Sequence, residues 1–180
     1  MLDPAFGYLI VVGTALLFGN AAVHKLRGLA HFTDVLAAYR VLPETWARRL
    51  AWLIPSLELC IAAGLLWKPC LHTSIVSAIA FLIAYAWGIG INLNRGRLDL
   101  DCGCGPARDR RTIGAWMVWR NSFLAAGLGI AALTWSPRTL GVVDLLTILG
   151  GLLVAITLYT AVDRLLGDIA PRLRPLGKNS

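Results

Sequence analysis

Five long stretches of the chain carry almost no charge, and they constrain the fold more than any other feature of the sequence. They cover residues 4–23, 50–67, 72–93, 113–134 and 141–162. A helix needs about 20 apolar residues to cross the roughly 30 Å hydrocarbon core of a bilayer, so each stretch has the length of a membrane span. The second is the least regular, because it contains Pro55 and Glu58.

Composition supports a lipid environment. The chain is 57% hydrophobic and 15% charged, whereas a soluble domain has about 45 to 50% apolar and about 25% charged residues. The apolar stretches are continuous rather than alternating, which favours helices over a β-barrel. The predicted fold is all-α, an integral membrane bundle with about five transmembrane helices. Residues 1–166 form the transmembrane domain and residues 167–180 a polar tail.

Two further predictions concern the first span and the loop that follows it. The chain begins Met1-Leu2-Asp3-Pro4, with an acid where a cleaved signal peptide needs basic residues, so the first stretch is expected to be a retained span. Between the first two spans, apolar residues recur at helical spacing among charged neighbours. They are Leu29, Phe32, Leu36 and Tyr39. This pattern predicts a short helix that lies in the membrane interface.

Lysine and arginine are distributed unequally between the two sides of a five-span bundle. Fourteen of the 17 fall on one side: Lys25, Arg27, Arg40, Arg48, Arg49, Arg95, Arg97, Arg108, Arg110, Arg111, Arg164, Arg172, Arg174 and Lys178. The other side has Lys68 and Arg138, and Arg120 lies within a span. This bias predicts that the basic side and the C-terminus are cytoplasmic and the N-terminus is outside. The net charge of +7 therefore fits loops that lie at an anionic membrane surface. A nucleic-acid-binding protein would instead cluster its basic residues on a soluble module, and the sequence predicts no such module.

A dithiol sequence in the loop before the fourth span is the main candidate for chemistry. Cys102 and Cys104 are separated only by Gly103, which allows a tight and strained disulfide of oxidising character. Four nearby arginines would favour the thiolate, whereas Asp99 and Asp101 would oppose it, so the sequence leaves the reactivity undecided. The alternative is a simple glycine-rich turn in which the cysteines are incidental.

The sequence predicts neither a metal site nor a disulfide between the other two cysteines, Cys60 and Cys70. A closed zinc site needs four ligands, and only His24 and His31 could join the two thiols from another loop, so no metal is predicted. Cys60 is expected to be a buried small hydrophobe. Cys70 lies about 15 Å along the helix from Cys60, which is too far for a disulfide.

Charged residues inside the spans predict a polar site beneath the dithiol loop. Glu58 and Arg120 lie at similar depth from the cytoplasmic side, and ionisable groups in a span tend to pair or to face a polar interior. We therefore expect a Glu58–Arg120 ion pair flanked by Asn121. Further polar residues lie at similar or shallower depth, namely Asn20, His24, Asn92 and Asn94. The alternative is that the pair only determines the order of the helices.

Several short stretches resemble the methylamine utilisation protein MauE family and its DoxX-like membrane relatives. They are residues 22–27 (Ala-Val-His-Lys-Leu-Arg), 39–43 (Tyr-Arg-Val-Leu-Pro), 54–59 (Ile-Pro-Ser-Leu-Glu-Leu), 101–105 (Asp-Cys-Gly-Cys-Gly) and Arg120-Asn121. The resemblance implies a four-helix DoxX-like core plus a C-terminal helix. In that family Phe-Gly commonly follows Cys-Gly-Cys, whereas Gly105-Pro106 follows here.

The resemblance also implies a function and a set of site residues. The function is disulfide formation in a partner such as the periplasmic methylamine dehydrogenase small subunit, beside a thioredoxin-like protein, in the bacterial inner membrane. The implied redox pair is Cys102 and Cys104. The matching positions of an intramembrane polar cluster are His24, Lys25, Glu58, Arg120 and Asn121.

Three function classes remain open at this stage. The first is a thiol-disulfide oxidoreductase, the second a non-catalytic membrane scaffold, and the third a small-molecule transporter, for which no inverted repeat is found. A periplasmic client conflicts with a cytoplasmic dithiol loop. Cys60, Cys70 or a bound quinone are the candidates for carrying electrons across.

Overall fold

The computed structural model describes residues 3–41, 43–103, 112–133 and 141–172. These residues form one short 3-10 helix and six α-helices: α1 (Pro4–Arg27), α2 (Leu29–Tyr39), α3 (Glu44–Leu65), η1 (Lys68–Cys70), α4 (Leu71–Asn94), α5 (Ala115–Leu133) and α6 (Val142–Arg172). The described part of the chain contains no strand, only one isolated bridge between Asp101 and Thr112. The predicted all-α fold is confirmed.

The helices follow the apolar stretches but extend beyond them in three places. α1 begins where Asp3 accepts a hydrogen bond from the Ala5 amide at 2.9 Å and Pro4 occupies the first turn, two features that favour a helix start. α1 then continues to Arg27, past the predicted end at residue 23. α3 begins at Glu44, before the stretch predicted from residue 50. α6 continues to Arg172, so the first residues of the predicted polar tail are helical.

Among the described residues, three helical segments are long and apolar enough to cross a membrane, namely Pro4–Arg27, Lys68–Asn94 and Val142–Val162. The other two predicted spans correspond to α3 and α5, which carry charged residues such as Glu58 and Arg120 within the helix. The chain is therefore a helical membrane protein. The count of five spans remains a prediction.

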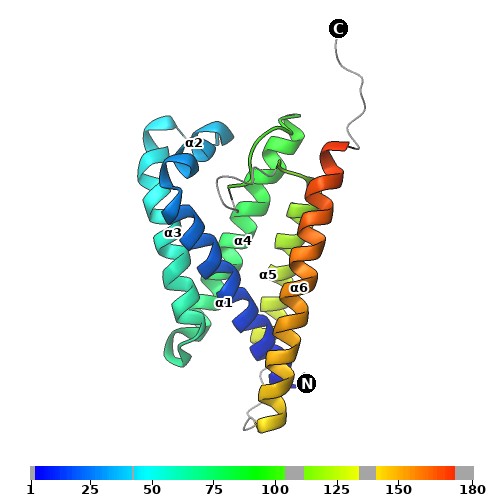
Figure 1. Ribbon diagram of the computed structural model, residues 1–180. Helices are drawn as coiled ribbons and strands as arrows, with labels where there is room; N and C mark the ends of the chain where they lie inside the picture. Colours follow the sequence, from blue (N-terminus) through cyan, green and yellow to red (C-terminus); the bar gives the residue numbers. More distant parts are fainter. Residues whose placement is uncertain (1–2, 42, 104–111, 134–140, 173–180) are drawn as a thin grey trace.

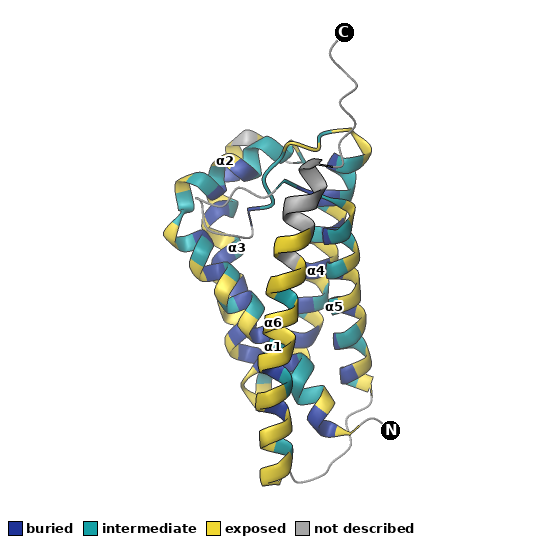
Figure 2. Ribbon diagram, turned by 45° about the vertical axis from the view of Figure 1, so that its right-hand side comes forward, coloured by how far each residue is buried: buried dark blue, intermediate teal, exposed yellow. Residues whose placement is uncertain are grey.

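Four helices enclose the core, and the last lies outside it. Buried residues of α1, α3, α4 and α5 form one cluster: Val11, Ala15, Phe18, Ile61, Ala62, Leu65, Ile75, Ala78, Leu82, Ala125 and Leu128. α6 packs on the first half of α1 through Ile148 and Leu152, which contact Ala5. Most of the other α6 side chains for which burial is described are exposed (Figure 2). This arrangement is the predicted four-helix core with an added C-terminal helix.

The two ends of the bundle differ in what they carry. α2, the loop after α4 and the end of α6 lie at one end, whereas the N-terminus and the turn between α3 and α4 lie at the other (Figure 1). The first end therefore holds the described segments that are rich in arginine, and the second holds Lys68. Which side of the membrane each end faces stays a prediction.

The structure corrects one prediction about the cysteines. Cys60 is exposed and not buried. It follows Glu58 by two residues, which is about 200° around a helix, so it points away from the core that Glu58 faces. Cys60 and Cys70 are both free thiols, as their expected separation requires.

Candidate functional site

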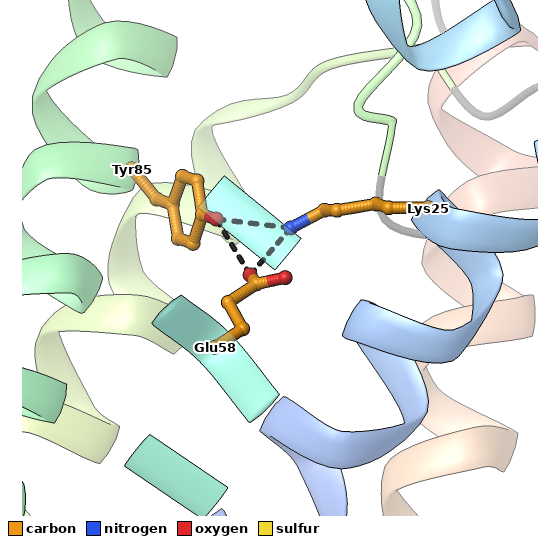
Figure 3. A network of polar contacts seen from close by, with 3 residues as sticks. All are labelled: Lys25, Glu58 and Tyr85. Atoms are coloured by element: carbon orange, nitrogen blue, oxygen red, sulfur yellow. Dashed lines mark hydrogen bonds and ion pairs between the residues drawn. The ribbon is translucent and has the colours of Figure 1, made fainter. Parts of the chain in front are cut away.

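A charged pair lies fully buried between three helices. Lys25 on α1 and Glu58 on α3 are 3% and 1% exposed. The Lys25 ammonium donates to Glu58 Oε1 and, at 2.9 Å, to the hydroxyl of Tyr85 on α4. The Tyr85 hydroxyl donates in turn to Glu58 Oε1 at 2.5 Å (Figure 3). We call these three residues the buried triad.

Aromatic rings complete the surroundings of the Lys25 ammonium. Its nitrogen lies 4.7 Å from the centre of the Tyr85 ring and 5.1 Å from the centre of the Phe32 ring on α2. Both distances are typical of cation–π contacts, which strengthen when the cation is withdrawn from water. The Lys25 ammonium of α1 therefore contacts side chains from α2, α3 and α4.

Helical spacing explains why the triad residues face inward. Each occupies the stripe of its helix that packs on the core, in a series with a step of seven residues, or about two helical turns. The series are Val11, Phe18 and Lys25 on α1; Ala51, Glu58 and Leu65 on α3; and Ala78, Tyr85 and Asn92 on α4. All nine positions are buried except Tyr85, which is half-buried.

The predicted Glu58–Arg120 ion pair is wrong. Glu58 pairs with Lys25, whereas Arg120 faces α6, where its Nη1 donates to the Tyr159 hydroxyl at 2.9 Å. The Arg120 guanidinium also lies 5.2 Å from the Trp116 ring centre. Similar depth was the only basis for the prediction, and depth does not determine the side of a helix on which a residue lies.

The other predicted polar residues are divided between different surroundings. Asn121 is buried on α5. Asn92 is buried near the end of α4, where its amide donates to the Gly88 carbonyl and its oxygen accepts from Arg97 at 3.2 Å. His24 is half-buried in the last turn of α1. The predicted cluster therefore consists of the triad members Lys25 and Glu58, with Arg120, Asn121 and His24 elsewhere.

The first cysteine of the dithiol lies at the base of its loop. Cys102 is half-buried and packs against Ile89, Ile113 and Met117. The Ile113 amide donates to the Leu100 carbonyl at 2.9 Å, so the segment leaves and rejoins the bundle at one place. Cys104 lies outside the described residues.

Gly103 fits the turn against α2. Its φ is +68°, a backbone conformation that favours glycine. A Cβ at this position would lie 3.0 Å from Val35 Cγ1 and 3.4 Å from Phe32 Cδ2. The Gly103 amide donates to Asp101 Oδ1 at 3.0 Å, and Asp101 Oδ2 lies 3.2 Å from His31 Nε2. Backbone conformation, packing and hydrogen bonding therefore all seat this turn on α2.

Phe32 connects the dithiol turn to the buried triad. Its ring lies next to Gly103 and also beside the Lys25 ammonium. Sequence reasoning missed Phe32 and Tyr85 as site residues, and it singled out Lys25 only through a family resemblance. The seven-residue series on α1 and α4 would have identified Lys25 and Tyr85.

Sequence comparisons identify known relatives of this chain. The methylamine utilisation protein MauE family matches residues 3–136. This chain belongs to that family. The matched region contains the triad, the dithiol loop and Arg120, whereas α6 follows it.

Individual members of the MauE family are similar over different shares of the chain. The methylamine utilization protein MauE of Paracoccus versutus is 36% identical over 172 residues, which are 94% of this chain and 91% of that protein. That of Methylophilus methylotrophus is 32% identical over 168 residues, or 92% and 88%. The match to the Paracoccus denitrificans protein is 34% identical over 86 residues, or 48% of this chain and 46% of that one. No solved structure shows a significant match.

Cys102 places a thiol at this end of the bundle. Among the described residues, no three histidine, cysteine, aspartate or glutamate side chains form a group that could hold a metal ion. Cys102 instead lies in a turn that is held on both sides, directly after the carboxylate of Asp101. As a thiolate, such a group can attack a disulfide of a second protein, and as half of a disulfide it can be attacked by the thiolate of a second protein.

Proposed function

We propose that this protein is a membrane thiol-disulfide redox protein that supports disulfide formation in a partner of the methylamine utilisation system. The partner proposed is the methylamine dehydrogenase small subunit. The seating of the Cys102 turn on α2 carries this proposal, because the close approach of Gly103 to Val35 and Phe32 holds the thiol in one position next to Asp101. Membership of the MauE family supports the system in which the protein acts.

The proposed reaction is an exchange of two electrons. A client thiolate attacks one sulfur of the Cys102–Cys104 disulfide, which breaks the S–S bond and forms a mixed disulfide. A second client thiolate then displaces the bound cysteine, so the client becomes a disulfide and the loop becomes a dithiol. An oxidant takes up the two electrons and two protons when the loop disulfide forms again. The oxidant classes proposed are the disulfide of a thioredoxin-like protein and a membrane quinone.

The proposed location is the bacterial inner membrane, with the N-terminus outside. The loop of Cys102 and the C-terminus are cytoplasmic, because arginine and lysine are concentrated at that end. Under this topology the thiols of the small subunit reach the loop on the cytoplasmic side, before that subunit is exported. A quinone in the bilayer would then take the two electrons and two protons from the reduced loop.

Serine substitution separates this function from that of a scaffold. Cys102→Ser with Cys104→Ser should abolish disulfide formation in the small subunit, measured by thiol alkylation and mass spectrometry of that subunit in cells that depend on this protein. A scaffold would keep its activity in this variant. Cys60→Ser with Cys70→Ser is the matched control, because Cys60 is exposed on α3 and Cys70 lies at the opposite end of α4 from Cys102.

A single substitution gives a second, positive readout. With only one loop cysteine left, the mixed disulfide has no neighbouring thiol to resolve it. The thiolate left in Cys104→Ser or Cys102→Ser can attack the disulfide of the thioredoxin-like oxidant, so each variant should accumulate a mixed disulfide with that oxidant, visible on a non-reducing gel. If neither variant traps a complex and the double variant matures the subunit normally, the proposal fails.

A further inference from the structure

We propose that His31 on α2 is a positioning residue for the Cys102 thiol and that it acts through Asp101. The inference rests on the proposed redox function of the dithiol. His31 contacts the carboxylate of Asp101, which directly precedes Cys102, so the proposed effect passes through that carboxylate. Nothing in the family match assigns this role to a histidine of α2.

The Asp101 carboxylate divides its two oxygens between the turn and the helix. Oδ1 accepts from the Gly103 amide at 3.0 Å, which closes the turn around Cys102. Oδ2 lies 3.2 Å from His31 Nε2. One side chain therefore connects the backbone on the far side of Cys102 to α2, and a shift of His31 is transmitted to the turn.

Two residues on the same face of α2 restrict the same turn. Val35 lies one helical turn after His31, and Phe32 follows His31 directly. A Cβ on Gly103 would meet both of them at 3.0 to 3.5 Å. The His31 and Asp101 side chains are 24% and 17% exposed, so water screens their interaction less than it screens a surface pair. The contact therefore belongs to a packed interface.

Electrostatics predicts the direction of the effect on Cys102. A carboxylate one residue away raises the cost of forming a thiolate, and the thiolate is the reactive form of cysteine. A hydrogen bond from His31 to Asp101 Oδ2 draws part of this negative charge toward α2. The contact should therefore raise the thiolate fraction of Cys102 and speed its reactions.

The test measures alkylation of Cys102 by iodoacetamide in the reduced full-length protein in nanodiscs, followed by peptide mass spectrometry. His31→Leu should slow this alkylation roughly two- to fivefold, the size of one partly screened charge interaction. His31→Gln, whose amide nitrogen can replace Nε2, should restore most of the rate. Cys70, in the same samples, is the internal control and should react at an unchanged rate.

The opposite direction identifies a purely structural role. If His31 only held the loop in place, His31→Leu would loosen the turn, expose Cys102 and accelerate its alkylation. Acceleration or an unchanged rate would overturn the proposal. If His31→Leu does not insert into membranes, His31→Phe, which keeps a ring but has no nitrogen, replaces it in the same comparison.

A second pair of variants tests the path through Asp101. Asp101→Asn keeps an oxygen for the Gly103 amide but removes the charge, so it should speed the alkylation of Cys102. In this background His31→Leu should have no further slowing effect. Slowing that persists would show that His31 does not act through Asp101. These rates come from reduced thiols, so they are informative even if Cys102 and Cys104 never form a functional disulfide.

Discussion

Lys25→Met is the most direct test of the buried triad. The substitution keeps a long side chain but removes the charge from a position that is 3% exposed. Glu58 then remains buried, and its Oε1 keeps the hydrogen bond from the Tyr85 hydroxyl. Its Oε2 accepts no hydrogen bond from the described residues. One hydrogen bond to a charged group contributes about 1.5 to 3 kcal/mol. This is less than the several kcal/mol that burying an ion costs.

The expected loss in the free energy of unfolding is therefore about 3 to 5 kcal/mol, the usual result when one partner of a buried pair is removed. Removing both charges should be far less harmful, because no uncompensated ion remains. Lys25→Met with Glu58→Leu should recover most of the loss and come within about 1 to 2 kcal/mol of the parent chain. The two single changes are thus strongly non-additive.

The assay is reversible unfolding in mixed micelles with increasing dodecyl sulfate, followed by tryptophan fluorescence and circular dichroism. Arg120→Met combined with Glu58→Leu is the matched control, because Arg120 contacts Tyr159 and not Glu58. That combination should show no rescue. The reasoning is refuted if Lys25→Met costs less than about 1 kcal/mol, or if the Lys25 and Glu58 changes add.

Two further outcomes test the dithiol loop. Gly103→Ala should cost about 1 to 2 kcal/mol, because alanine adopts positive φ poorly and its Cβ would press on Val35. Adding Val35→Ala should recover only the part of this loss in unfolding free energy that comes from packing, as measured by the same unfolding assay. Full recovery would show that the backbone conformation of residue 103 costs nothing. In intact cells, a membrane-impermeant maleimide should leave Cys102 unlabelled until the inner membrane is made permeable. Efficient labelling from outside would reverse the proposed topology.

The helices and their order could be predicted, because span length and basic-residue distribution are properties of the chain that need no tertiary information. α2 was predicted from Leu29, Phe32, Leu36 and Tyr39, and it is present at residues Leu29–Tyr39. The exposure of Cys60 could have been predicted as well. It follows from the position of Glu58 on the core stripe of α3.

The contacts of the site were harder to predict. The apolar stretch ends at residue 23, which predicts that Lys25 lies beyond the span, yet α1 continues to Arg27 and carries Lys25 inward. The fit of Gly103 against Phe32 and Val35 joins residues about 70 positions apart in the chain. The residues next to Gly103 in the sequence do not indicate such a contact. The sequence indicated that a glycine was needed there, but not what pressed against it.

The position of Phe32 implies a reciprocal linkage between the loop and the membrane interior. Its ring contacts Gly103 on the loop side and stabilises the Lys25 ammonium on the bundle side. If closing the disulfide moves Gly103 relative to this ring, the strength of the Lys25–Glu58 pair changes with the oxidation state. Thermodynamic reciprocity then requires the same free energy to appear in the reduction potential of the dithiol. A charge pair within the bundle would thus set how readily thiols at its surface are oxidised.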